Sequence, residues 1–163
     1  MTVLLEVKGL QKVYTTRFGG TSVTALRNVN LSVEKGEYIA IMGESGSGKT
    51  TLLNILAALD KPTRGQVLLD GNDITAISEK ELSAFRRSNL GFVFQDFNLL
   101  DTFNLKDNIF LPLVLSGKKY GEMSKRLKPL AAMLGISDIL YKYPYEVSGG
   151  QKQRAAVARA LIT

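Results

Sequence analysis

The most specific pattern in this 163-residue sequence is Gly43-Glu44-Ser45-Gly46-Ser47-Gly48-Lys49-Thr50. It fits the phosphate-binding loop G-x-x-x-x-G-K-[ST] at every fixed position. An apolar run, Tyr38–Met42, precedes it and predicts a buried strand, and Thr51–Leu59 follows it and predicts a helix. Strand, glycine-rich loop and helix are the context that this pattern requires, which argues against the alternative of a glycine-rich turn that happens to contain a lysine.

The residue types of this loop suit an anionic ligand. Glycines permit positive φ and a close approach of the backbone, so successive N–H groups can form an anion-binding nest at the N-terminus of a helix. By the pattern, Lys49 reaches the β- and γ-phosphates of a nucleotide and the Thr50 hydroxyl coordinates Mg²⁺.

A second motif, Ser148-Gly149-Gly150-Gln151, opens a helix predicted from Lys152 to about Leu161. Ser148 suits an N-cap, and the glycines leave the N–H groups of the first turn uncovered. Alone, the motif leaves open the alternative of a Ser-Gly loop that enters a helix. Beside a phosphate-binding loop, it predicts a second anion site.

The two motifs together resemble the ATP-binding subunit of an ABC transporter, and the resemblance runs from about residue 2 to residue 163. In that family the signature falls at Val147–Gln151, a functional glutamine at Gln95 and an adenine-stacking aromatic at Tyr14. The stretch Leu59–Gly65 resembles the group that serves macrolide, lipoprotein and antimicrobial-peptide transporters. Residues 85–102 are most similar to its bacitracin-resistance branch.

The resemblance implies ATP and Mg²⁺ as cofactors and assigns roles by position. Lys49 and Gln95 are the catalytic candidates, and Thr50 and Gln95 the metal contacts. The residues implied to hold the nucleotide are Tyr14, Gly43, Ser45, Gly46, Ser47, Gly48, Lys49, Thr50 and Thr51, with Ser148, Gly149, Gly150 and Gln151 acting on the ATP of a second subunit. The alternatives are a packed aromatic at Tyr14 and a strand-terminal polar residue at Gln95.

The resemblance also implies partners and missing elements. It implies a head-to-tail dimer of two ATP-binding subunits, bound to a transmembrane permease at the cytoplasmic face of the cell membrane. The family's next elements are an apolar strand ending in Asp-Glu and a switch histidine, whereas this sequence ends at Thr163 and has no histidine. We therefore expect a truncated cassette that binds nucleotide weakly and hydrolyses essentially none. Exposed strand edges should then favour self-association, strand exchange or local disorder.

The expected fold is α/β, a P-loop NTPase core with an N-terminal antiparallel β subdomain and an inserted α-helical subdomain. It forms one domain over residues 1–163, with a core to about 103, a helical subdomain over about 104–150 and a return helix over 151–163. The pattern predicts further strands at 3–8 continuing to Tyr14, and at Ala25–Val33, Gln66–Leu69 and Leu90–Phe94. A capping box at Ser78–Glu81 starts a helix to about Arg87. Prolines 112 and 129 should bend or interrupt two later helices.

The apolar residues after Gln95 predict either an exposed groove for the permease or a buried cluster; they are Phe97, Leu99, Leu100, Phe103 and Phe110.

Charge and composition narrow the function classes. The net charge of +6 lies wholly in residues 83–163, which carry 12 basic and 6 acidic side chains. The basic residues offer only a short version of a stripe with interleaved aromatics, at Lys118–Tyr120 and Lys125–Lys128, so we expect no nucleic-acid partner. A solvated helix face is favoured, and a face near an anionic membrane surface is the intermediate alternative. The chain has no cysteine and no apolar run long enough to span a membrane.

Three other functions remain open at this point. A soluble ABC ATPase of DNA repair or translation would carry a long coiled-coil insertion or a second cassette, and neither is visible here. A small-molecule kinase or GTPase would share the loop but not Ser148–Gln151, and the sequence has no Asn-Lys-x-Asp guanine motif. The chain could also be a folding unit without activity of its own.

Overall fold

The computed structural model describes residues 2–15 and 20–163, and the chain divides into two compact units, Met1–Leu82 and Ser83–Thr163. The sequence over 17–22 is rich in turn-forming residues and predicts a connection there, but it falls partly on residues 16–19, which lie outside the described residues. The helical subdomain predicted over about 104–150 lies within the second unit, and its boundaries remain a prediction.

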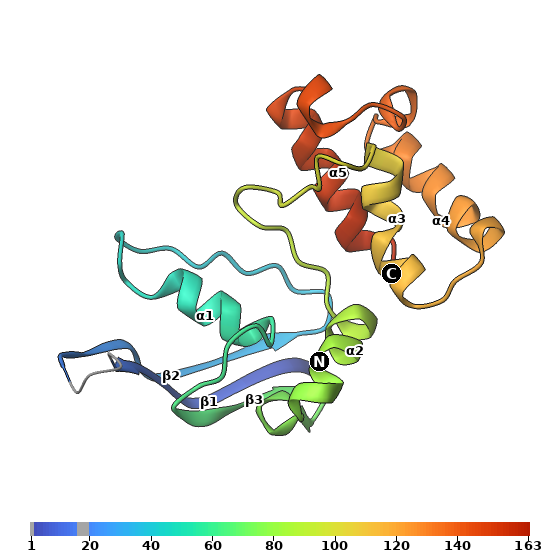
Figure 1. The fold of residues 1–163 in the computed structure, drawn as a ribbon. Helices are drawn as coiled ribbons and strands as arrows, with labels where there is room; N and C mark the ends of the chain where they lie inside the picture. Colours follow the sequence, from blue (N-terminus) through green and yellow to red (C-terminus); the bar gives the residue numbers. More distant parts are fainter. Residues whose placement is uncertain (1, 16–19) are drawn as a thin grey trace. The chain divides into compact units, whose positions relative to one another are not determined.

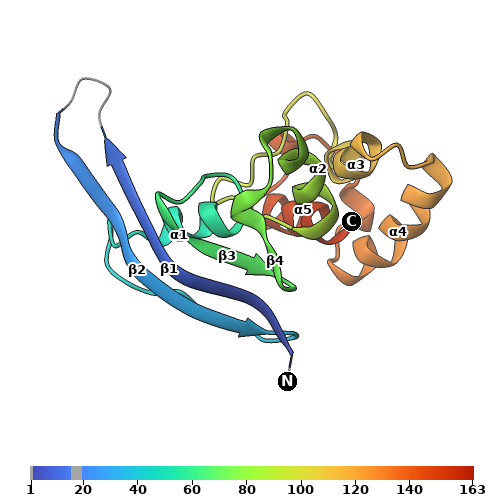
Figure 2. The ribbon, with the colours of Figure 1, turned by 90° about the horizontal axis from the view of Figure 1, so that it is seen from below.

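An antiparallel sheet of order β2-β1-β3-β4 organises the first unit (Figure 2). Its strands are β1 (Val3–Thr15), β2 (Ser22–Glu34), β3 (Arg64–Leu69) and β4 (Asn72–Asp73). This confirms the strands predicted around residues 3–14, 25–33 and 66–69. The two predicted pieces of β1 form one strand, whose register against β2 shifts on both sides of Leu10.

Helix α1 (Lys49–Leu56) lies over one face of this sheet (Figure 1). Leu52 and Ile55 of α1 are buried, as are Leu10 and Val67 of the sheet, and each such burial stabilises the fold by about 1.5–3 kcal/mol. The helix ends before the predicted Leu59, because the N–H groups of Leu59 and Asp60 both return to the carbonyl of Asn54.

A short 3-10 turn, η1 (Ile74–Ala76), leads to α2 (Glu79–Asn89). Ser78 Oγ donates a hydrogen bond to Glu81 Oε2 at 2.6 Å where the capping box was predicted. The helix predicted to reach about Arg87 is thus confirmed.

Two predicted strands are wrong. Within the described residues, neither Tyr38–Met42 nor Leu90–Phe94 joins a sheet or forms a regular element. Tyr38 is 94% exposed and Met42 is 87% exposed, so the first segment is not buried either. A strand needs a neighbouring strand to satisfy its N–H and C=O groups, and an apolar run in a sequence does not specify that neighbour.

The second unit is built on α3 (Leu105–Leu115), α4 (Tyr120–Met133) and α5 (Gly149–Leu161), with 3-10 turns η2 (Ser137–Ile139) and η3 (Pro144–Glu146) between α4 and α5 (Figure 1). Their buried faces form one core that includes Leu105, Ile109, Leu127, Ile136, Ala155 and Ala158. The segment 104–146 contains no strand, as predicted.

Pro112 and Pro129 lie inside α3 and α4, and each helix continues through its proline as one element. The prolines therefore do not interrupt their helices, and the alternative that they bend them stays a prediction. A proline inside a helix costs about 3 kcal/mol. The burial of Ile109, Phe110 and Leu113 around Pro112 offsets that cost.

No helix within the described residues is long and apolar enough to cross a membrane.

Candidate nucleotide-binding site

The phosphate-binding loop curls around its own lysine. Lys49 Nζ donates hydrogen bonds to the carbonyls of Gly43 (2.8 Å) and Glu44 (2.6 Å) and to Ser47 Oγ (3.3 Å). The predicted loop residues from Gly43 to Ser47 are exposed, and Thr50 is also exposed, while Gly48, Lys49 and Thr51 are half-buried. The ammonium group thus lies at the mouth of an open loop, where it can exchange carbonyl partners for an anion.

Glycine at position 48 is required by conformation and by space. Its φ of 91° is left-handed, and a Cβ there would lie 2.4 Å from the carbonyl oxygen of Ala25 on β2. This close contact sets the start of α1 against the sheet. No side chain among the described residues caps the N-terminus of α1 at Gly48, so the N–H groups of its first turn are available for an anionic ligand.

The residues present fit a magnesium ion only together with phosphates. Within the described residues, no cluster of three or more His, Cys, Asp or Glu side chains could hold a metal ion. Mg²⁺ keeps several waters and is usually bound through one or two carboxylates plus substrate phosphates. The exposed hydroxyl of Thr50 at the start of α1 is a suitable oxygen ligand beside such phosphates.

Tyr14 lies near the end of β1 and is 44% exposed, so it is not a packed core aromatic. Its hydroxyl donates to Asp60 Oδ2 at 2.8 Å, and Lys12 Nζ lies over its ring, 4.8 Å from the centroid. Lys12 also donates to Asp60 Oδ1 at 2.6 Å. The sequence analysis missed Lys12 and Asp60. Two signals were available in the sequence. Lys12 and Tyr14 are two positions apart, which places both side chains on one face of a strand, and Leu59–Gly65 contains an acidic residue, Asp60.

The signature motif forms the predicted N-cap of α5. Ser148 Oγ accepts a hydrogen bond from the Gln151 backbone N–H at 3.3 Å, and Gln151 Oε1 accepts one from the Ser148 N–H at 2.9 Å. Ser148, Gly149 and Gly150 are exposed and Gln151 is half-buried. This reciprocal capping box fixes the helix start while its two glycines stay open to solvent.

Gln95 is exposed, and the segment after it is fixed by a residue that the sequence analysis missed. Asn108 is fully buried: its Nδ2 donates to the carbonyls of Leu100, Phe103 and Asn104, each at 3.0 Å, and its Oδ1 accepts from the Leu100 N–H at 2.7 Å. The only signal in the sequence was an amide directly before the apolar run Ile109–Leu115.

The five apolar residues after Gln95 are not all buried. Phe110 is buried and Phe97 and Leu99 are half-buried, but Leu100 is 44% exposed and Phe103 is 40% exposed. The alternative of a wholly buried cluster is therefore wrong.

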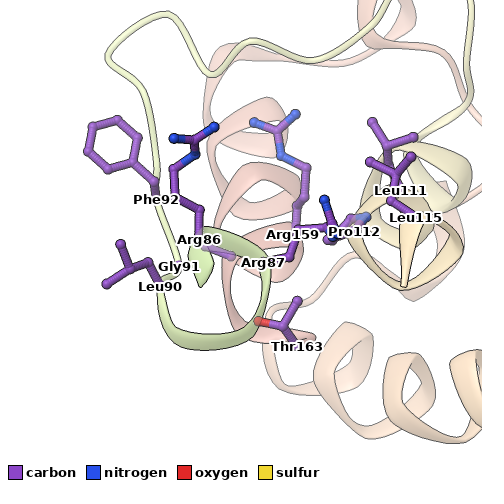
Figure 3. A pocket seen from close by; sticks show the side chains of 11 residues that line it. Arg86, Arg87, Leu90, Gly91, Phe92, Leu111, Pro112, Leu115, Arg159 and Thr163 are labelled. Atoms are coloured by element: carbon purple, nitrogen blue, oxygen red, sulfur yellow. The ribbon is translucent and has the colours of Figure 1, made fainter. Parts of the chain in front are cut away.

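A cavity of about 280 Å³ lies within the second unit (Figure 3). None of the residues that line it belongs to the phosphate-binding loop. Arg86 and Arg87 of α2 and Arg159 of α5 line it together with Leu90, Phe92 and other apolar residues. Arg159 donates to the carbonyls of Asn98 and Phe97, each at 2.6 Å, and its burial lowers the pKa of its guanidinium below the ordinary value. This arginine thus ties α5 to the segment after Gln95.

The structure therefore gathers the predicted residues in two sets. Tyr14 and the loop Gly43–Thr50 belong to the first unit, and Gln95 and the signature Ser148–Gln151 belong to the second. Within each set, local hydrogen bonds hold the backbone of the motif.

Comparison with known proteins identifies relatives over nearly the whole chain. The ABC transporter family profile matches residues 26–163. An uncharacterized ABC transporter ATP-binding protein, YvcR, of Bacillus subtilis is 54% identical over 98% of this chain and 61% of its own length. The bacitracin export ATP-binding protein BceA of Halalkalibacterium halodurans is 47% identical over 98% of this chain and 62% of its own length. The chain thus spans a little over three-fifths of these two relatives.

Solved structures agree on the fold. The dimeric structure of MJ0796, a bacterial ABC transporter cassette, is similar with a TM-score of 0.88 and 39% identity, over 98% of this chain and 69% of that one. A post-hydrolysis state of MJ0796 bound to ADP and Pi is similar to the same degree. The α/β fold of the ABC cassette, predicted from the sequence, is confirmed, and the DNA-repair or translation alternative is not favoured.

Proposed function

Because this chain belongs to the ABC transporter family, we propose that it is the ATP-binding part of a transporter subunit, which couples ATP binding and hydrolysis to the movement of a substrate by a membrane permease. The observation that carries the proposal is the open loop at α1: the left-handed glycines Gly46 and Gly48, an ammonium group at the loop mouth and a helix N-terminus that no described side chain caps. These features complement a chain of phosphates.

Each predicted residue takes a role that its position supports. Lys49 exchanges its bonds to the carbonyls of Gly43 and Glu44 for bonds to phosphate oxygens. Tyr14, with an exposed ring, stacks on adenine. The backbone of Gly43, Ser45, Gly46, Ser47 and Gly48 holds the phosphates, with Thr51 near the α-phosphate. Thr50 and Gln95 contact Mg²⁺, which when bound neutralises phosphate charge.

The proposed partners are a second ATP-binding subunit and a permease. In a head-to-tail dimer, Ser148, Gly149, Gly150 and Gln151 of one subunit meet the ATP held by the other. The dimeric structure of MJ0796 and the bacitracin export named for BceA support this assignment. With a permease as partner, the proposed place of the chain is the cytoplasmic face of the membrane. The partly exposed Leu100 and Phe103 are the surface that we assign to the permease.

Titration of labelled ATP, with and without Mg²⁺, tests the proposal. Lys49→Ala removes a charge-assisted phosphate contact worth about 1.5–3 kcal/mol and should weaken binding by about tenfold or more. Lys8→Ala is the control, because Lys8 is an exposed lysine of the same unit paired with Glu6, and it should bind as the wild type does. Equal affinity of the wild type and Lys49→Ala would contradict the site. Phosphate release, measured in parallel, tests the prediction that residues 1–163 alone hydrolyse essentially none.

A further inference from the structure

Asp60 joins two side chains of β1 to the turn after α1. Its Oδ2 accepts from the Tyr14 hydroxyl at 2.8 Å, and its Oδ1 accepts from Lys12 Nζ at 2.6 Å and from the Lys61 N–H at 2.7 Å. Lys12 donates a further bond to the Lys61 carbonyl at 2.6 Å. Both carboxylate oxygens are thus engaged, and one of their partners is the ring proposed to meet the nucleobase.

Hydrogen bonds also hold the backbone beside Asp60, Lys12 and Tyr14. The Val13 N–H donates to Thr63 Oγ1 at 2.9 Å, and the Thr63 N–H donates to the Gln11 carbonyl at 2.8 Å. The turn therefore has hydrogen bonds with four successive residues of β1, from Gln11 to Tyr14. A side chain on this frame has its position set by the turn as well as by its own strand.

The charges of Lys12 and Asp60 also favour this arrangement. The Lys12 side chain is only 12% exposed, yet its ammonium is paired with Asp60 and lies over the Tyr14 ring. Burial acts to raise the pKa of Asp60, but the hydrogen bonds from Lys12 and Tyr14 outweigh it and lower that pKa below the ordinary 3.8. The carboxylate is therefore ionised at neutral pH and accepts charge-assisted hydrogen bonds, which are the stronger kind.

We propose that Asp60 is a positioning residue for nucleobase binding: it fixes the Tyr14 ring through the phenol and holds Lys12 against one face of that ring, so that the base stacks on the other face. This inference rests on the proposed function. An exposed tyrosine without such a partner would lose rotamer freedom when a base binds, and the ordering of one such side chain reduces affinity by about twofold to tenfold.

Asp60 and Tyr14 should affect the binding of the nucleobase but not that of the phosphates, so a ligand with a base is compared with one that has phosphates alone. Calorimetric titrations of the full chain use ATP and inorganic tripolyphosphate as the two probes. Asp60→Ala and Tyr14→Phe, which keeps the ring but loses the hydroxyl, should each weaken ATP binding about threefold to tenfold and leave tripolyphosphate binding unchanged. The double variant should bind ATP no more weakly than Asp60→Ala alone, because both changes remove the same contact. Glu6→Ala, which removes an exposed carboxylate of β1, is the matched control and should change neither affinity.

The possible outcomes test this inference separately from the proposed function on which it rests. A wild type that binds neither probe overturns the proposed function and the inference with it. A wild type that binds both, beside an Asp60→Ala variant with unchanged ATP affinity, overturns the inference alone. An equal loss of both probes in Tyr14→Phe, which retains the aromatic packing, would show that the contact only supports the fold and would also overturn it.

Discussion

Single residues fix the conformation of the phosphate-binding loop. Gly46 and Gly48 both have left-handed φ, 79° and 91°, but only Gly48 is close to another backbone, with the Ala25 carbonyl 2.4 Å from the position of an added Cβ. Alanine substitutions at the two glycines therefore separate the energetic cost of a left-handed backbone from the energetic cost of a steric clash.

Gly48→Ala should lower the free energy of unfolding by roughly 2–5 kcal/mol, because a left-handed alanine and an overpacked contact each cost about 1–3 kcal/mol. Gly46→Ala should cost only about 1–2 kcal/mol, because no atom lies within 4 Å of its added Cβ. Urea unfolding of the two variants measures the difference. Equal losses would show that β2 moves away from the loop at no cost.

At the scale of elements, Asn108 connects α3 to the segment that follows Gln95. The two hydrogens of its amide nitrogen are shared among three carbonyls and its amide oxygen accepts a fourth contact, and it is the only buried polar side chain recorded within the described residues. A buried amide with complete partners holds a loop in one conformation, and loss of the amide leaves the loop's N–H and C=O groups without partners.

Asn108→Leu should therefore lower the free energy of unfolding by about 2–4 kcal/mol, since a buried unsatisfied group costs about 1–3 kcal/mol. Asn104→Ala in the same helix is the comparison: it removes the N-cap bond to the Asp107 N–H, at 2.8 Å, and should cost about 1 kcal/mol. Urea denaturation gives both values. If Asn108→Leu proved no more costly than Asn104→Ala, the loop would not depend on this residue.

At the scale of the whole molecule, the exposed apolar segment 38–42 is a candidate for contact with other chains. Tyr38 and Met42 are among the most exposed large hydrophobic residues, and their backbone joins no sheet within the described residues. Exposed apolar surface of this kind favours association.

We expect the wild type to self-associate with rising concentration in sedimentation velocity. The double variant Tyr38→Glu with Met42→Lys should remain monomeric, because the two charges remove the exposed apolar surface. Met133→Lys on α4 is the matched control, since Met133 is also 76% exposed but lies in a helix, and it should associate as the wild type does. A wild type that is monomeric at every concentration would contradict this prediction.

The sequence by itself determined the local structure of this protein. The glycine pattern placed the loop at the start of α1, and Ser148 with Gln151 defined the start of α5. The alternation over residues 25–33 identified β2. These features depend on turns, caps and periodicities that involve residues close together in the chain, so a single sequence contains them.

Only the tertiary structure decided the contacts between distant residues. Asp60 meets Tyr14 across 46 positions, and nothing in either neighbourhood specifies that pairing. The apolar runs 38–42 and 90–94 matched the pattern of buried strands, yet neither joins a sheet in the described residues. The physical reason is the same in both cases: a strand ladder or a side-chain cluster forms only where a remote partner supplies the other half of each hydrogen bond.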